Sequence, residues 1–260
     1  MNSLRLNLHR QFLSRILPVL LSGLIFFSVS SGALALEGYY TEEEVRTFAP
    51  AGGPDNVVIR KSWYADDRMR KDEGWMGITI ARFDLDCIYI LEPRSRTYVE
   101  ISPEFLAQYS PRGLKAFGAQ EDERGVLYFP DDLYIRTETT KKIGLWNCYQ
   151  VVTNPRYRSP KAPYVVLWYS TEVEFPVHIF TDQLRRLFGK SPAAEGLFNR
   201  LTQFEGYPVR TEAHGPAANV ITTLIRIQRQ KDMNPEQFEV PADYTKEIMP
   251  EEIPGLRWDR

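Results

Sequence analysis

The sequence predicts a mainly β protein of the α+β class: a strongly curved antiparallel sheet of roughly ten strands, with short helices covering its concave face. The first observation is residues 76–101, where three apolar-alternating runs are separated by two short polar turns. Such turns leave no room for the crossovers that parallel strands need. The second is a helical stretch, residues 180–205, whose Phe and Leu stripes need an apolar surface to cover. The inner face of a curved sheet supplies that surface.

The first 35 residues have the composition of a secretory signal peptide. Three arginines precede an apolar stretch at residues 16–29, and an Ala-Leu-Ala cleavage sequence ends at Ala35. We therefore expect an exported, periplasmic protein that is cut near Ala35. The alternative is an uncleaved anchor, although the apolar stretch is short for a transmembrane helix.

Length, aromatic content and charge limit the class of protein to which the rest of the chain can belong. Residues 36–260 suit a single domain. The 14 Tyr, 14 Phe and 5 Trp of the chain favour strands and a large apolar interior or cavity. The leader holds three Arg and no acidic residue, which leaves 29 basic and 34 acidic residues, a net charge of −5. Because nucleic-acid binding needs a basic face, we expect no nucleic-acid partner.

The first strands are predicted at residues 39–48, 57–64 and 68–73. We interpret Glu42–Glu44 as a solvated edge that blocks strand addition. The third strand carries a basic run that is either an outer strand face or a contact for a lipid headgroup or a partner. That run is Arg68, Arg70 and Lys71.

Alternation in the central stretch assigns its side chains to faces. The apolar faces of the three runs carry Ile78 and Ile80, Ile88 and Ile90, and Val99 and Ile101. Turns are expected at Asp84–Asp86 and Pro93–Arg96, because Asp bonds its own backbone and Pro lacks the N–H of a central strand. The alternative for Asp84 and Asp86 is a carboxylate metal site. We predict no metal and no cofactor.

The second half continues the same architecture after a short helix that begins near Ser102. Two amphipathic helices are expected within 180–205, the second ended by Gly206. The tail, residues 234–260, is predicted to be irregular, with Phe238, Val240 and Tyr244 packed back onto the sheet. The further strands are expected at residues 133–142, 145–153, 163–171, 207–213 and 219–230.

The exported part contains two cysteines and two histidines. Cys87 and Cys148 form a disulfide, which export permits, or remain two buried unpaired thiols. Neither lies in a basic, His-containing neighbourhood, so a catalytic cysteine is not predicted. The sequence has no catalytic motif, and an enzyme would need His178 or His214 beside a nucleophile or a carboxylate. We expect no enzyme activity.

The order of several motifs resembles the lipoprotein-carrier superfamily of bacterial envelopes (LolA/LppX-like), and in particular a branch of unknown function. These motifs are WYADDRMRKDE, DLDCIYILEPRSRTYVEI, KKIGLWNCYQV, GYPVR and NPEQFEVPADY, within residues 40–245. The resemblance implies an unclosed β-barrel with helices at its mouth and a hydrophobic cavity for the acyl chains of lipids or lipoproteins. The chain departs from lipid-anchored members because it lacks a lipobox cysteine.

The first hypothesis is therefore a binding or carrier protein that holds an acyl-chain, lipid or lipoprotein ligand between sheet and helices. The alternative is a non-enzymatic structural or interaction module of the envelope with a filled barrel and a protein partner. A large apolar pocket supports the first hypothesis, and its absence supports the second. The residues predicted to line the cavity are Ile78, Ile80, Ile88, Ile90, Leu184, Leu187, Phe188, Leu197, Phe198 and Leu201.

Overall fold

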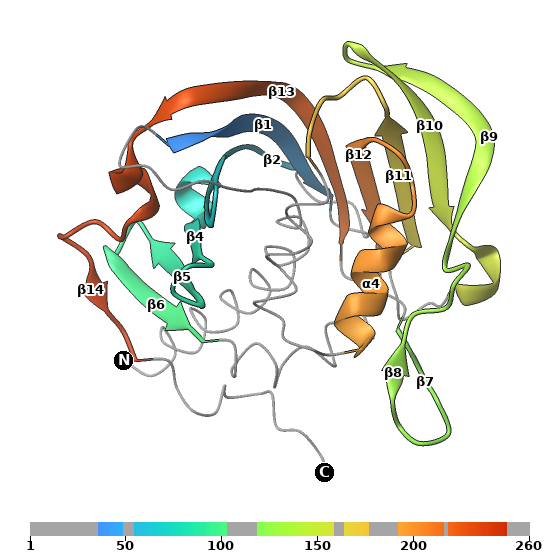
Figure 1. Cartoon of the computed structure of the whole chain (residues 1–260), viewed down its shortest axis with the longest axis horizontal. Helices are drawn as coiled ribbons and strands as arrows, with labels where there is room; N and C mark the ends of the chain where they lie inside the picture. The colour runs from blue at the N-terminus through green and yellow to red at the C-terminus, as the bar shows by residue number, and fades with distance from the viewer. Residues whose placement is uncertain are drawn as a thin grey trace.

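The computed structural model describes residues 36–48, 55–102, 119–158, 164–176, 192–215 and 218–248. Within these ranges, twelve strands form one strongly curved sheet in the order β14-β6-β5-β4-β3-β2-β1-β13-β12-β11-β10-β9, with β14 and β9 outermost (Figure 1). The sheet is composed of β1 (Leu36–Phe48), β2 (Asn56–Ala65), β3 (Arg68–Asp72), β4 (Ile78–Arg82), β5 (Cys87–Glu92), β6 (Thr97–Ile101), β9 (Tyr134–Ile143), β10 (Trp146–Thr153), β11 (Tyr164–Ser170), β12 (Tyr207–His214), β13 (Asn219–Met233) and β14 (Thr245–Lys246).

The predicted fold class is confirmed: the protein is mostly strand, and its sheet is curved and open. One pair departs from the antiparallel pattern, because β14 runs parallel to β6. The described residues also contain a small hairpin, β7 (Gln120–Glu121) and β8 (Leu127–Tyr128), and three 3₁₀ turns. The turns are η1 (Gly74–Met76), η2 (Pro155–Tyr157) and η3 (Pro235–Phe238).

The described part of the chain has one α-helix, α4 (Pro192–Thr202), which is the second helix expected in 180–205. The helix expected near Ser102 and the first helix of 180–205 fall mostly or wholly outside the described residues. No helix among those described is both long and apolar enough to cross a membrane. The prediction that Gly206 ends this helix is wrong, because α4 ends at Thr202 and Gly206 lies four residues further along the chain. A Cβ at this position would lie 2.3 Å from the Ser170 carbonyl oxygen, so the close approach of the two segments needs glycine.

Strands β1 to β6 have two distinct faces. The outer face of β3 to β6 is covered by a C-terminal strap, which we define as residues 234–247 (Figure 1). The opposite, inner face carries a large apolar cluster that also includes side chains of α4, β12 and β13. Because side chains alternate along each strand, neighbours two residues apart stay on one face.

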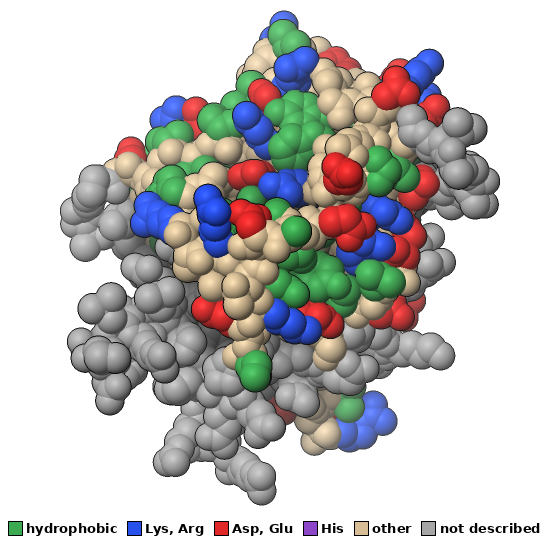
Figure 2. All heavy atoms as spheres, turned by 90° about the vertical axis from the view of Figure 1, so that its left-hand side faces the viewer, with side chains coloured by type: hydrophobic (Ala, Val, Ile, Leu, Met, Phe, Trp, Pro, Cys, Tyr) green, Lys and Arg blue, Asp and Glu red, His purple; other side chains and the backbone are tan. Residues whose placement is uncertain are grey.

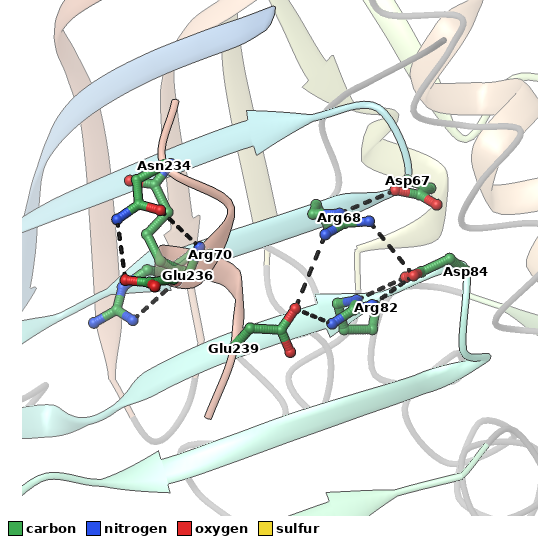
Figure 3. A network of polar contacts seen from close by, with 9 residues as sticks. Asp67, Arg68, Arg70, Arg82, Asp84, Asn234, Glu236 and Glu239 are labelled. Atoms are coloured by element: carbon green, nitrogen blue, oxygen red, sulfur yellow. Dashed lines mark hydrogen bonds and ion pairs between the residues drawn. The ribbon is translucent and has the colours of Figure 1, made fainter. Parts of the chain in front are cut away.

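The strap packs on the outer face through apolar anchors and ion pairs. Phe238 is fully buried beside Met233 and Ala65, and Val240 and Tyr244 pack against Ile78, Ile80 and Leu91. The predicted packing of these three tail residues is thus confirmed. Glu239 forms ion pairs with Arg82 and Arg68, as Figure 3 shows; the N–O distances are 2.5 and 3.9 Å. In addition, Arg70 donates to the backbone oxygen of Gln237 at 3.1 Å.

The molecular surface on this side mixes both signs of charge. Figure 2 shows Lys and Arg side chains interspersed with Asp and Glu among apolar side chains. Ion pairs account for part of the pattern, including Lys246 with Glu100 and Arg96 with Asp243. No single-sign patch dominates the described residues of this face, which agrees with the small net charge of the chain.

Candidate functional site: a buried charged cluster on the inner face

A row of three charged side chains crosses the inner face of β1 and β2 and reaches Glu73, just after β3. Glu43 lies opposite Arg60 in the sheet register. The Nε of Arg60 donates to Glu73 Oε1 at 2.6 Å, and its Nη1 donates to Glu43 Oε2 at 3.4 Å. All three are buried, with Arg60 only 3% exposed. Burial opposes the charge of Arg60, but the carboxylates of Glu73 and Glu43 outweigh it and raise its pKa.

A second polar row lies beside the first, two residues along each strand. Thr41 of β1 pairs with Ser62 of β2, and Ser62 pairs with Lys71 of β3. These side chains are 0%, 0% and 1% exposed. Within the described part of the chain, neither hydroxyl makes a hydrogen bond of ordinary geometry, and the Tyr64 phenol lies near both of them. Burial lowers the pKa of Lys71 to about 7; the positive charge of Arg60 adds to this, while Glu73 and Glu43 oppose it.

Aromatic side chains border the two rows. Tyr64 of β2 and Tyr207 of β12 are both buried, and burial followed by the charge of Glu43 raises the pKa of each phenol. The Phe175 ring lies 6.0 Å from the Tyr64 ring and 5.3 Å from the Tyr207 ring. The charged cluster therefore lies in apolar, largely water-excluded surroundings, where electrostatic interactions are strong.

The polar rows continue into apolar ones across the sheet. The row of Lys71 continues through Thr79 to Ile90 and Val99. The next row on the same face is apolar from end to end and consists of Tyr39, Tyr64, Met69, Ala81, Ile88 and Ile101. The inner face is thus charged at β1 to β3 and apolar at β5 and β6.

The structure does not bring the four predicted lining isoleucines together. Ile78 lies opposite Leu91, and all three of Ile78, Ile80 and Leu91 pack under the strap on the outer face. Ile88 and Ile90 occupy the inner face. Alternation correctly predicts that Ile78 and Ile80 share one face and that Ile88 and Ile90 share one face. It does not predict whether these two faces are the same side of the sheet, which the register between β4 and β5 decides. Only Ile88 and Ile90 remain on the side of the expected cavity.

Phe198 is the helical residue that reaches the inner face. It is 3% exposed and belongs to the same apolar cluster as Ile88. The other helical candidates cannot be placed on this face: Leu184, Leu187 and Phe188 lie outside the described residues, as do the side chains of Leu197 and Leu201.

Both cysteines are free and buried, so the disulfide alternative is not realised in this structure. Their strands, β5 and β10, are separated by seven strands in the sheet order. Burial raises the pKa of both the Cys87 and the Cys148 thiol. Raised thiol pKa values disfavour the thiolate form that nucleophilic chemistry needs.

The other polar candidates have structural partners. Arg82 donates to both carboxylate oxygens of Asp84, at 2.7 and 2.6 Å, across the turn between β4 and β5. The Nε2 of His214 lies 3.6 Å from Glu212, and the imidazole is 40% exposed. His178 lies outside the described residues. Among the residues that the structure describes, no group of three or more His, Cys, Asp or Glu side chains is arranged to hold a metal ion.

The charged cluster is not evident from the sequence, because the burial of β1 depends on strands that are distant along the chain. Glu42–Glu44 was expected at a solvated edge, but β1 is a central strand between β13 and β2, and Glu43 is buried. The pairing of β1 with β13 joins segments about 180 residues apart, which local patterns cannot reveal. One pattern was informative: charges occupy the same alternating face as Tyr64 and Met69 in two successive strands, as Arg60 and Lys71 do.

The fold and the site define a protein with an open, curved sheet whose inner face is partly apolar and partly ionic. No family model and no curated protein matches the chain. Among solved structures it is similar to a LolA superfamily protein from Nitrosomonas europaea, at 10% identity and a TM-score of 0.31, over 78% of this chain and 90% of that one. It is also similar to a DUF1329 family protein from Desulfovibrio piger ATCC 29098, at 8% identity and a TM-score of 0.31, again over 78% and 90%.

A further similarity is to PNGF-II, at 11% identity and a TM-score of 0.35; it covers 81% of this chain but only 31% of that protein. The superfamily named from the sequence motifs is therefore among the structural matches. At these identities and TM-scores, the similarities do not define a function.

Proposed function

We propose that the chain is an exported, periplasmic binding or carrier protein that holds a hydrophobic ligand between the inner face of the sheet and its helices. The ligand is an acyl chain of a lipid or lipoprotein. A signal peptide at residues 1–35 and a single domain at 36–260 are part of this proposal. No enzymatic step and no cofactor are included.

The observation that carries the proposal is the apolar inner face of an open sheet. One apolar cluster joins Ile88 and Ile101, in β5 and β6, with Val209 and Leu224, in β12 and β13, and it includes Phe198 of α4. No second sheet closes over this face in the described part of the chain. Displacement of a helical cover would therefore expose a broad apolar surface suited to an acyl chain.

The energetics of acyl-chain burial are favourable. Transfer of a 16-carbon chain out of water contributes about 12 kcal/mol at about 0.8 kcal/mol per methylene. Association costs at least about 4 kcal/mol. The remaining 8 kcal/mol corresponds to a dissociation constant of roughly 1 μM, and displacement of Phe198 from its packing weakens it further.

The second candidate is an envelope interaction module whose interior is already filled. The observation in its favour is the tight packing of the same face: Ile101 is 0% exposed and Val209 is 1% exposed. A filled core would leave the outer surfaces of the sheet to contact a protein partner. The two candidates differ in whether acyl chains enter the interior.

Native mass spectrometry of the full chain, expressed in a bacterium and purified without detergent, tests the proposal. We expect a protein that begins at Leu36 and carries an added mass that extracts as lipid. A fluorescent fatty-acid probe added to the delipidated protein should bind with a dissociation constant of roughly 1 μM or a larger value in the micromolar range. Phe198→Ala should raise this affinity, because the ligand no longer has to displace the Phe198 ring. Leu145→Ala, at a position that is 78% exposed in a hairpin turn, should leave the affinity unchanged. A bare mass together with no probe binding would support the filled module instead.

A further inference from the structure

One end of the inner face is polar, and a pure hydrocarbon ligand can form neither hydrogen bonds nor ion pairs with its side chains. Arg60 is engaged by the carboxylates of Glu43 and Glu73, so its charge is already balanced. The neighbouring row offers different chemistry: two buried hydroxyls, Thr41 and Ser62, beside the amine of Lys71. All of these groups can donate hydrogen bonds, and none of them is a carboxylate.

We propose that Thr41, Ser62 and Lys71 bind the oxyanion head of an amphipathic ligand, a carboxylate or a phosphate at the end of an acyl chain. This inference rests on the proposed function, because it takes the acyl-chain ligand as given and assigns its head. The state of the two hydroxyls favours an anion. The hydroxyls of Thr41 and Ser62 are fully buried and, within the described residues, unsatisfied by hydrogen bonds of ordinary geometry. A buried donor without an acceptor costs free energy that an oxyanion restores.

The direction of the tail follows from the same row. From Lys71 the cross-strand neighbours are Thr79, Ile90 and Val99, so polarity falls step by step from β3 to β6. Three strand spacings cover about 14 Å. An acyl chain whose head contacts Lys71 would therefore extend over Ile90 and Val99, beside the apolar row that contains Ile88.

The charge of the site is compatible with an added anion. Burial and the nearby Arg60 disfavour the ammonium form of Lys71, and an oxyanion beside it would favour that form again. The row of Arg60 and the row of Lys71 cross the same strands and lie side by side. The charge of Arg60 is balanced by Glu43 and Glu73, so a head bound at Lys71 gains its charge-assisted hydrogen bond from Lys71.

The test compares ligands that differ only in the head. Hexadecanoic acid, its methyl ester and hexadecyl phosphate are titrated into the full, delipidated protein, and binding is followed by tryptophan fluorescence and by native mass spectrometry. We expect the acid or the phosphate to bind at least about tenfold more tightly than the ester, as expected for a charge-assisted hydrogen bond. Preference for the phosphate or for the acid then identifies the head.

Lys71→Met should remove the preference, measured as the ratio of the acid and ester dissociation constants. The matched control is Lys61→Met, which removes an exposed lysine from the opposite face of the adjacent strand and should keep the preference. If Lys71→Met fails to fold, the nearly isosteric pair Thr41→Val and Ser62→Ala should still weaken acid binding severalfold.

Equal binding of acid and ester by the wild-type protein would overturn the inference, as would a preference that survives in Lys71→Met or that is undiminished in the Thr41→Val, Ser62→Ala variant. Failure of all three ligands to bind would instead contradict the proposed carrier function. The two failures are therefore distinguishable in one set of titrations.

Discussion

Removal of Arg60 should destabilise the protein far more than removal of an exposed arginine from the same sheet. Arg60 is 3% exposed and lies between two buried carboxylates, at 2.6 Å from Glu73 and 3.4 Å from Glu43. The variant Arg60→Met keeps most of the side-chain volume but leaves both carboxylates buried without their partner. Loss of one member of a buried ion pair costs about 3–5 kcal/mol. For a domain of this size, that corresponds to a fall in Tm of roughly 6–20 °C.

Urea unfolding followed by tryptophan fluorescence and far-ultraviolet circular dichroism measures this loss. The control is Arg46→Met, which breaks the ion pair of Arg46 with Glu44 on the outer face of β1. Those side chains are 47% and 30% exposed, and exposed pairs contribute at most about 1 kcal/mol.

A triple variant separates the charge effect from simple loss of packing. Arg60→Met combined with Glu43→Gln and Glu73→Gln leaves no buried charge uncompensated in this row, so we expect it to recover most of the lost stability. The reasoning is refuted if Arg60→Met costs no more than the Arg46 control, or if the triple variant is no more stable than Arg60→Met.

Three further outcomes are expected. Phe238→Ala, which empties a fully buried site under the strap, should cost about 3–5 kcal/mol in urea unfolding, whereas Ile248→Ala at a 94% exposed position should cost almost nothing. The pKa of Lys71 is about 7 in the folded protein, against an ordinary value of 10.5, so between pH 7 and 10.5 the unfolded chain binds one more proton than the folded protein. The free energy of unfolding, relative to that of Lys71→Met, should therefore rise with pH in this window by up to about 1.4 kcal/mol per pH unit. A difference that does not change with pH would contradict this. Gly206→Ala should cost more than about 1 kcal/mol, because φ is +95° and the new Cβ would meet the Ser170 carbonyl oxygen at 2.3 Å; thermal unfolding at unchanged Tm would disprove it.

The sequence specified the strands well where their neighbours are local. The run from Ile78 to Ile101 folds as the predicted meander, because short turns fix which residues pair and alternation fixes which share a face. The turn at Asp84 also formed as expected, and its carboxylate is held by Arg82. In these segments, local chemistry and tertiary structure agree.

The candidate site depended on pairings that the sequence did not reveal. Glu43 is buried because β1 lies between β2 and β13, and the partner residue of Glu43 in β13 is Leu224. Likewise Ile78 and Ile80 turn away from the inner face because the C-terminal strap, more than 150 residues later, provides an apolar cover for them. Alternation predicts that two faces exist, but only the distant partners decide which face becomes the interior.

We expect the ligand preference to depend on the row of Lys71 and not on the row of Arg60. Well-packed neutral side chains of similar volume stabilise an interior as well as a buried ion pair does, so the row of Arg60 is not required for a stable core. The triple variant that neutralises this row leaves Thr41, Ser62 and Lys71 unchanged. We therefore expect it to remain folded and to prefer hexadecanoic acid over its methyl ester, as the wild type does. Loss of the preference in the folded triple variant would place the head at Arg60 and contradict its assignment to the row of Lys71.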